Sequence, residues 1–174
     1  ALVADDVDAI IGPTSSNSAI GALDEAVAAG VVTCSATATS IALDGFPDDG
    51  LFFRTIATDS LQAVAIARTA NDTGAPDVAI IHVDDAFGRP YAEATIDALR
   101  DEGSFNVTIV SVPVGDDDLT DELDELADSG AQTAIVLGNG ADTGRFLEAI
   151  AQRADIALND IVVNDAARSA ATRP

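Results

Sequence analysis

Short apolar runs alternate along the chain with segments in which apolar residues recur at helical spacing. The runs are rich in Val and Ile and show no regular alternation with polar residues. Strands covered on both faces of a parallel sheet have this composition, whereas half-exposed strands alternate. We therefore predict strands at residues 7–11, 31–34, 77–83, 107–112, 133–137 and 161–163, with a short one at 51–53.

The intervals between the runs carry the signals of amphipathic helices. The first helix is expected to be capped by Ser16 or Asn17 and closed by Gly30. Another is expected to hold Pro90 in its first turn and to end at Gly103. Of the remaining helices, one is predicted to be capped by Ser60, one to start after Asp118, and one to start at Asp142 or Thr143.

This order of elements predicts an α/β fold built on parallel sheets wrapped by helices. Such sheets bind ligands at the carboxyl ends of their strands, where the N-termini of the following helices point. We therefore expect functional residues in the loops that follow Ile11, Cys34, Val83, Leu137 and Val163.

The composition narrows the range of functions. Hydrophobic residues make up 48% of the chain, enough for a substantial core, and the formal net charge is −22. All eight basic residues are Arg. Such a field repels phosphate backbones and anionic lipids, which disfavours nucleic-acid and membrane-surface roles. The acidic excess fits adaptation to salt and the codon bias of a GC-rich genome equally well.

The sequence contains few residues that could act as nucleophiles or metal ligands. Cys34 is the only cysteine and His82 the only histidine. Cys34 ends an apolar run, so we expect a buried small hydrophobe rather than a nucleophile. The acidic stretch at 116–125 lacks the spacing of a calcium loop and is expected to be a solvated helix start.

Two hydroxyl-rich loops follow the first two strands, at residues 12–18 and 35–40. Hydroxyl groups and free amides before a helix bind carboxylates, although ordinary N-capping gives the same pattern. Neither loop holds Lys or Arg, so the carboxylate of a zwitterion suits them better than a phosphate dianion.

Two other loops offer weaker signals. The Asp84–Asp85 pair after a strand could hold a metal, as in phospho-receiver domains, but that chemistry needs a lysine and the chain has none. Solvated carboxylates are the alternative. The glycine-rich turn at 138–144 lacks the dinucleotide-binding spacing, and we expect a helix-start turn there.

The order of these motifs resembles the type I periplasmic binding proteins, and within them the branched-chain amino-acid (Leu/Ile/Val) receptors of ABC importers. The resemblance rests on residues 7–16, 31–39, 51–55 and 78–88, where Phe87 and Gly88 open the next helix. It implies a partial chain of this fold, with 1–56 as part of the first ligand-binding lobe and 57–174 as most of the second.

The resemblance also implies a set of ligand-binding residues. Ser16 matches a residue that binds the ligand carboxylate, and Ala38 and Thr39 match a pair that holds carboxylate and ammonium. In the second lobe, Phe87 matches an aromatic contact and Asp165 the acid that pairs with the ammonium. Asn139 stands where the family often has an aromatic residue, which leaves the class of ligand open.

The expected function is that of an extracytoplasmic solute-binding protein, periplasmic or lipid-anchored. It would bind an amino acid or similar small polar metabolite and pass it to the membrane subunits of an ABC importer. We expect no catalysis, metal, cofactor, nucleic acid or membrane insertion. A ligand-sensing domain of a receptor or regulator with the same fold is the alternative, and a small α/β enzyme of flavodoxin-like or receiver type is a third.

Overall fold

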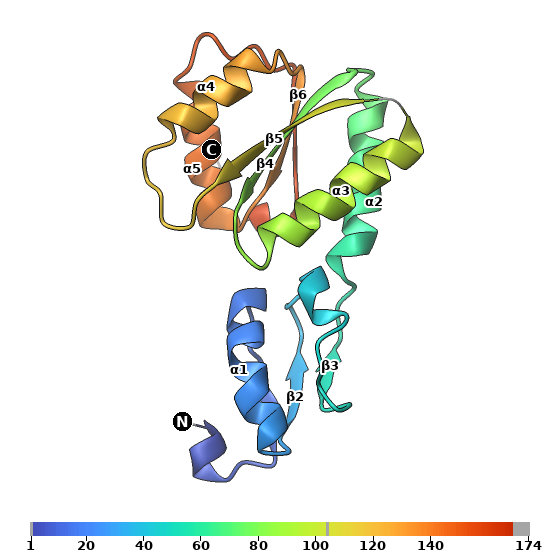
Figure 1. The fold of residues 1–174 in the computed structure, drawn as a ribbon, viewed down its shortest axis with the longest axis vertical. Coiled ribbons are helices and arrows are strands. Elements are labelled where there is room, and N and C mark those ends of the chain that lie inside the picture. The colour runs from blue at the N-terminus through green and yellow to red at the C-terminus, as the bar shows by residue number, and fades with distance from the viewer. Residues whose placement is uncertain (1, 104, 169–174) are drawn as a thin grey trace. The chain divides into compact units, whose positions relative to one another are not determined.

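The computed structural model describes residues 2–103 and 105–168 and divides the chain into two compact units (Figure 1). The first unit is Ala1–Leu61 and the second is Gln62–Pro174. The division falls within helix α2 (Asp59–Asp72), a little later than the predicted boundary at residue 56. The assignment of the units to two lobes remains a prediction.

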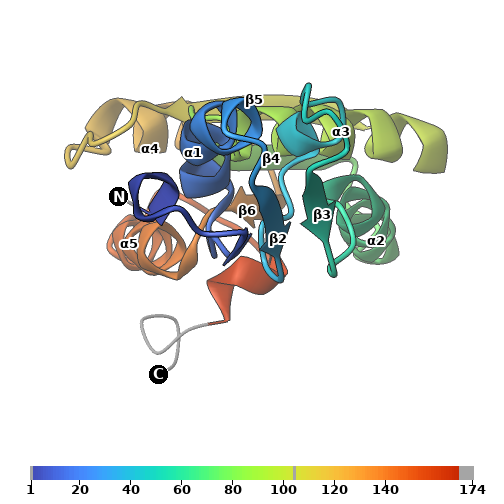
Figure 2. The same ribbon diagram turned by 90° about the horizontal axis from the view of Figure 1, so that it is seen from below.

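The first unit is built on a parallel sheet in the order β1-β2-β3. Helix α1 packs one face against it, because Ala19, Leu23 and Ala26 follow the helical period and are all buried. Figures 1 and 2 show α1 beside this sheet. The elements are η1 (Leu2–Asp5), β1 (Ala9–Ile11), α1 (Ser16–Ala28), β2 (Val32–Ser35), η2 (Ile41–Leu43) and β3 (Phe52–Arg54).

The core of this unit lies on one face of the sheet only. Leu23 of α1, Leu43 of η2 and Phe52 of β3 form its centre. On the opposite face Ile11 is 87% exposed and Phe53 53% exposed. These two exposed residues depart from the prediction that all strands are covered on both faces.

The second unit has a parallel sheet in the order β5-β4-β6-β7. The apolar runs predicted at 77–83 and 133–137 are β4 and β6, the two central strands. The elements of this unit after α2 are β4 (Asp77–Val83), α3 (Gly88–Glu102), β5 (Asn106–Val112), α4 (Thr120–Asp128), β6 (Thr133–Leu137), α5 (Gly140–Ala151), β7 (Asp160–Val163) and η3 (Asp165–Ala167).

Helices cover both faces of this second sheet. On β4, Val78 and Ile80 pack toward α2 and α3, whereas Ala79, Ile81 and Val83 pack toward α4 and α5. Figure 2 shows the sheet between these two pairs of helices. The predicted α/β class, with helix-wrapped parallel sheets, is confirmed. In this sheet the central strands are continuously apolar because helices bury both of their faces.

Three predicted helix starts are wrong by one to three residues. The N-cap of α1 is Ser15, whose side chain accepts the N–H of Ser18, rather than Ser16 or Asn17. Helix α2 begins at Asp59, so Ser60, the predicted cap, lies inside the helix. Helix α5 begins at Gly140 with Asn139 as its N-cap, ahead of the predicted start.

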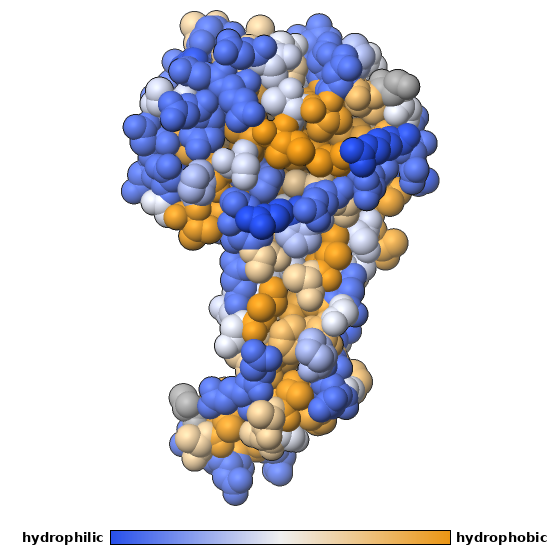
Figure 3. All heavy atoms as spheres, viewed as in Figure 1, coloured by the Kyte–Doolittle hydropathy of each residue, from blue (hydrophilic) through white to orange (hydrophobic). Residues whose placement is uncertain are grey.

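On the face drawn in Figure 3, the surface of the second unit is mainly polar. Figure 3 shows hydrophilic residues over α3 and α4, with hydrophobic residues gathered over β5 between them, where Ile109 is partly exposed. No helix in the described part of the chain is long and apolar enough to cross a membrane.

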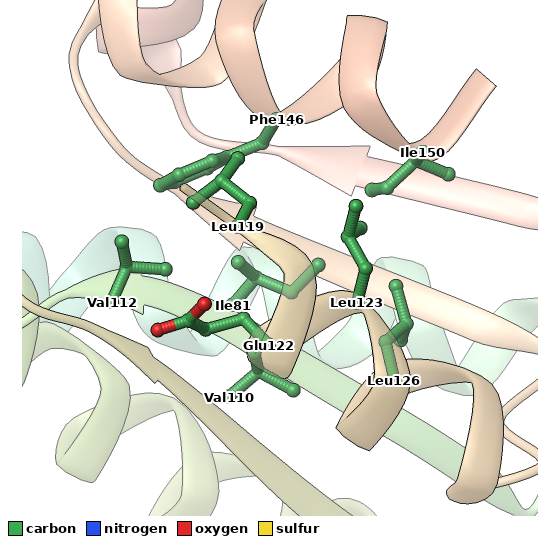
Figure 4. Close-up of a pocket in the computed structure, with 9 residues that line it drawn as sticks. All are labelled: Ile81, Val110, Val112, Leu119, Glu122, Leu123, Leu126, Phe146 and Ile150. Atoms are coloured by element: carbon green, nitrogen blue, oxygen red, sulfur yellow. The ribbon is translucent and has the colours of Figure 1, made fainter. Parts of the chain in front are cut away.

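A cavity of about 10 Å³ lies between α4, α5 and the sheet of the second unit. In Figure 4, Leu119, just before α4, and Leu123 of α4 face Phe146 and Ile150 of α5 across this gap. Its volume matches roughly a single water molecule, and an apolar lining keeps such a space dry. It is a packing gap rather than a solute site.

Candidate functional site

The two hydroxyl-rich loops of the first unit lie together at the carboxyl edge of its sheet. Ile11 pairs in register with Cys34, so the residues after both strands leave the sheet side by side. The Ser35 hydroxyl donates to the carbonyl oxygen of Pro13 at 2.6 Å, and the Thr37 hydroxyl donates to that of Thr14 at 2.7 Å. These hydroxyl groups thus tie one loop to the other.

Ser16 links the same two loops from the helix side. Its side chain is buried in the first turn of α1, and its hydroxyl oxygen accepts the N–H of Ser40 at 3.1 Å. A hydroxyl group can accept one such bond and still donate its own proton. Ser16 is therefore placed to hold the second loop and to offer a proton to a carboxylate.

Ala38 and Thr39 occupy the centre of the second loop. Ala38 is fully buried, and its N–H donates to the Ser35 hydroxyl oxygen at 3.0 Å. Thr39 is half-buried, and its carbonyl oxygen accepts the N–H of Asp59 at 3.0 Å. The loop's hydrogen bonds within the described residues do not use the Thr39 hydroxyl. Of this pair, Thr39 is the better placed to contact a solute.

In the second unit, the residues after β4 are ordered by Asp85. One oxygen of its carboxylate accepts the N–H groups of Phe87 at 2.9 Å and Gly88 at 2.7 Å, which starts α3. The Phe87 ring is half-buried and meets the Tyr91 ring edge to face, with ring centroids 5.7 Å apart. Asp85 therefore serves the loop, and Phe87 forms an apolar wall at its tip.

Asp84 is held by an ion pair. Arg89 Nε donates to its carboxylate at 2.6 Å, and this hydrogen bond lowers the pKa of Asp84 and raises the pKa of Arg89. No group of three or more His, Cys, Asp or Glu side chains in the described ranges is arranged to hold a metal ion. The pair Asp84–Asp85 has structural partners that explain it without a metal.

Asn139 is occupied in starting α5. Its side-chain oxygen accepts the N–H groups of Ala141 and Asp142, and its Nδ2 donates to the Asp142 carboxylate at 2.6 Å. A Cβ at Gly138 would lie 3.3 Å from Thr143 Oγ1, a tight contact, and Gly138 does not have a positive φ. As N-cap, Asn139 has little freedom left to follow a solute.

Asp165 is exposed at the start of η3, directly after β7. Its N–H donates to Gln62 Oε1 at 3.4 Å. Val136 of β6 pairs with Val163 of β7, and His82 of β4 pairs with Leu137 of β6. The structure thus brings Phe87, Asn139 and Asp165 to one edge of the second sheet.

Two residues at this edge escaped the sequence analysis. Asn164 is buried, and its Oδ1 accepts the N–H of Gly138 at 3.2 Å, which links the ends of β6 and β7. Its Nδ2 and the Thr143 hydroxyl are buried without a hydrogen-bond partner in the described part of the chain. An Asn directly after a predicted strand was the available signal, but the resemblance drew attention to its neighbour Asp165.

The sequence pattern of the periplasmic binding protein family matches residues 1–172. None of the curated proteins matches the chain by sequence. Several solved structures share its fold.

A leucine binding protein from Thermotoga maritima superposes with a TM-score of 0.81 at 19% identity, covering 94% of this chain and 46% of its own. A solute binding protein of an ABC transporter from Rhodopseudomonas palustris, in complex with p-hydroxybenzoic acid, gives 0.81 at 22%, covering 96% and 45%. A type 1 periplasmic binding protein from Bordetella pertussis gives 0.81 at 18%, covering 97% and 46%.

The chain therefore spans less than half the length of each of these solved structures. The family match covers all of the described residues. The chain belongs to the periplasmic binding protein family and has the fold of its type I members.

Proposed function

We propose that this chain is part of an extracytoplasmic solute-binding protein of an ABC importer. Residues 1–56 would belong to the first ligand-binding lobe and 57–174 to the second. The solute would be an amino acid or a similar small carboxylate, held between the lobes. Closure of the lobes would then present the loaded protein to the membrane subunits of the importer.

The observation that carries this proposal is the pair of cross-linked hydroxyl loops in the first unit. Ser16 and Thr39 lie on loops that Ser35 and Thr37 tie together at the carboxyl edge of the sheet. Fixed neutral donors of this kind bind one carboxylate without a large desolvation cost. Ser16 and Thr39 would donate to the solute carboxylate, and Ala38 would shape the loop between them.

The second unit would supply the contacts that recognise the rest of the solute. The Phe87 ring would pack on its apolar part, and the exposed Asp165 carboxylate would pair with an ammonium group. Asn139 would line the site from its place at the start of α5. In this scheme Asp165 distinguishes an amino acid from an acid that lacks the ammonium group.

The places of His82 and Cys34 and the types of the proposed site residues support a binding role over catalysis. His82 is buried in β4 with Nδ1 2.9 Å from the carbonyl oxygen of Val83. Cys34 belongs to the first unit, in strand β2. The residues proposed for the site are hydroxyl, amide, aromatic and carboxylate groups without a base beside a nucleophile.

The test is a thermal-shift screen of the full-length protein against L-amino acids and aromatic acids. A ligand at a hundred times its dissociation constant stabilises the folded state by roughly 2.7 kcal/mol, which raises the melting temperature by several degrees. A shift with one chemical class supports the proposal and identifies the solute class. A cooperative melt that no solute shifts would contradict it.

Variants then assign the contacts. Thr39→Val removes a hydroxyl group and should weaken binding by about 1 kcal/mol or more, whereas Thr69→Val on the exposed side of α2 should leave it unchanged. Asp165→Asn should weaken the binding of an amino acid. It should leave the affinity for an aromatic acid without an ammonium group unchanged. If Thr39→Val binds the solute as tightly as wild type does, Thr39 is not part of the site.

A further inference from the structure

Arg54 makes an unusual set of contacts for a residue at the end of a strand. It pairs in register with Ser35, the residue that ties the two hydroxyl loops together. Its Nη1 donates to the carbonyl oxygen of Ser40 at 3.1 Å, and its Nη2 forms an ion pair with the Asp44 carboxylate. The Arg54 side chain is 16% exposed and that of Asp44 is 37% exposed.

Asp44 extends this contact to the next segment of the chain. Its second oxygen accepts the hydroxyl proton of Thr58 at 3.0 Å. One residue further on, the N–H of Asp59 donates to the carbonyl oxygen of Thr39 at 3.0 Å. The segment 39–44 is therefore held at both of its ends. Arg54 of β3 contacts both ends, and the residues that follow β3, Thr58 and Asp59, contact one end each.

The guanidinium group is suited to this geometry. Its planar fork donates to two acceptors at once, here a backbone carbonyl and a carboxylate, whereas a Lys ammonium offers a single point of charge. With its charge matched by Asp44, the Arg54 side chain is occupied within the protein. Its contacts point to a role in holding the loop rather than in binding an anion.

We infer that Arg54 is a positioning residue, which together with Asp44 fixes the backbone of Thr39 and Ser40 for solute binding. Thr39 carries the candidate hydroxyl group, and the N–H of Ser40 orients the Ser16 hydroxyl. A shift of this backbone would therefore displace both proposed carboxylate donors. The inference concerns the order of the loop, and its consequence for affinity rests on the proposed function.

The first experiment measures backbone amide hydrogen exchange on the full-length protein without any ligand. In Arg54→Lys and in Asp44→Asn, the amide hydrogens of Ser40 and Asp59 should exchange about tenfold faster or more, because their loop opens locally. Amides in the core of α1 and in β2 should keep their rates. Arg68→Lys, which alters an exposed ion pair with Glu102, is the matched control.

Unchanged exchange at Ser40 and Asp59 would overturn the inference. Equal acceleration across the whole first unit would also overturn it, since that result describes loss of global stability rather than of loop order. The double variant Arg54→Lys/Asp44→Asn should exchange no faster than the more affected single variant, because both substitutions break the same contact.

The second experiment separates positioning from a purely structural role. L-leucine and 4-hydroxybenzoate are titrated calorimetrically into wild type, Arg54→Lys and Arg68→Lys. A probe that binds wild type should bind Arg54→Lys about tenfold more weakly, with no change in the denaturant midpoint of the unliganded protein. Unaltered affinity in Arg54→Lys contradicts the inference. If neither probe binds wild type, these two solutes are not its ligands, while the exchange rates still decide the role of Arg54.

Discussion

The α-carbon of Gly88 lies against the carbonyl oxygen of Val83, so closely that a Cβ on Gly88 would overlap this oxygen. The contact arises because the chain turns from β4 into α3 within a few residues, with Asp85 accepting the N–H groups of Phe87 and Gly88. The turn places the Phe87 ring at the edge of the sheet. A backbone oxygen in a central strand cannot move aside, so only Gly fits here.

Gly88→Ala should therefore destabilise the protein by about 3 kcal/mol, the upper range for forcing an atom into a packed site. Gly21→Ala is the control, because a Cβ at Gly21 meets nothing and the residue lies inside α1. It should stabilise the protein by roughly 0.5–1 kcal/mol through helix propensity. Chemical unfolding of both variants measures the difference, and similar values for the two would show that the turn is not tight.

Thr143→Val should stabilise the protein by about 1 kcal/mol, because it replaces a buried hydroxyl group that has no partner within the described residues. The same change at Thr95, whose hydroxyl donates to the Tyr91 carbonyl oxygen at 2.8 Å, should give no gain. Thermal and denaturant unfolding decide the sign. Destabilisation by Thr143→Val would show that the hydroxyl group binds an internal water in solution.

Acid should weaken a surface contact near the end of α5. The Arg153 guanidinium holds the pKa of Asp155 at about 2, below its ordinary value of 3.8. A carboxylate with a lowered pKa stabilises the folded state above its unfolded pKa, and this contribution is lost as pH falls from about 4 toward 2.

Replacing Arg153 tests the cause directly. In Arg153→Gln, the pKa of Asp155 should rise toward its ordinary value, as followed by carboxyl carbon chemical shifts in an NMR titration. The part of the acid sensitivity due to this pair should disappear at the same time. A pKa that stays near 2 would mean that another group sets it.

Salt should stabilise the protein. The formal net charge is −22, with 30 acidic residues against 8 Arg. The negative side chains therefore repel one another in the compact folded state. Raising NaCl from about 0.1 M to 1 M shortens the screening length from roughly 10 Å to 3 Å and should raise the melting temperature.

The size of the salt response can be traced to the acidic excess. Asp121→Asn/Glu125→Gln on the exposed side of α4 should reduce the response, because it removes two negative charges. Tetramethylammonium chloride should act like NaCl if screening is the cause. A response limited to Na⁺ would indicate specific cation binding instead.

The strands of the second sheet could be predicted most closely from sequence. The bounds of β4 and β6 agree with the apolar runs to the residue, because both strands are buried on two faces and end at turn residues. Helix starts were less accurate. Ser15, Ser16 and Asn17 are all good N-caps, and only the contact between Ser16 and Ser40 shows why Ser15 takes that role.

The candidate site was predictable in part. The placement of Phe87, Asn139 and Asp165 after neighbouring strands follows from the parallel order, and the resemblance supplied the residue types. Arg54 and Asn164 stand at predicted strand ends, but their contacts could not be predicted in this way. Their partners lie 14 and 26 residues away in the chain, at distances where local patterns carry no information.

The sequence by itself determined the alternation of strands and helices, the parallel arrangement and the strongly negative field, because these depend on periodicity, local propensity and summed charge. Only the tertiary structure decided which hydroxyl groups cap a helix, which join two loops and which remain buried without a partner. Those outcomes depend on the register of neighbouring strands, which brings residues such as Ser16 and Ser40 within hydrogen-bond distance.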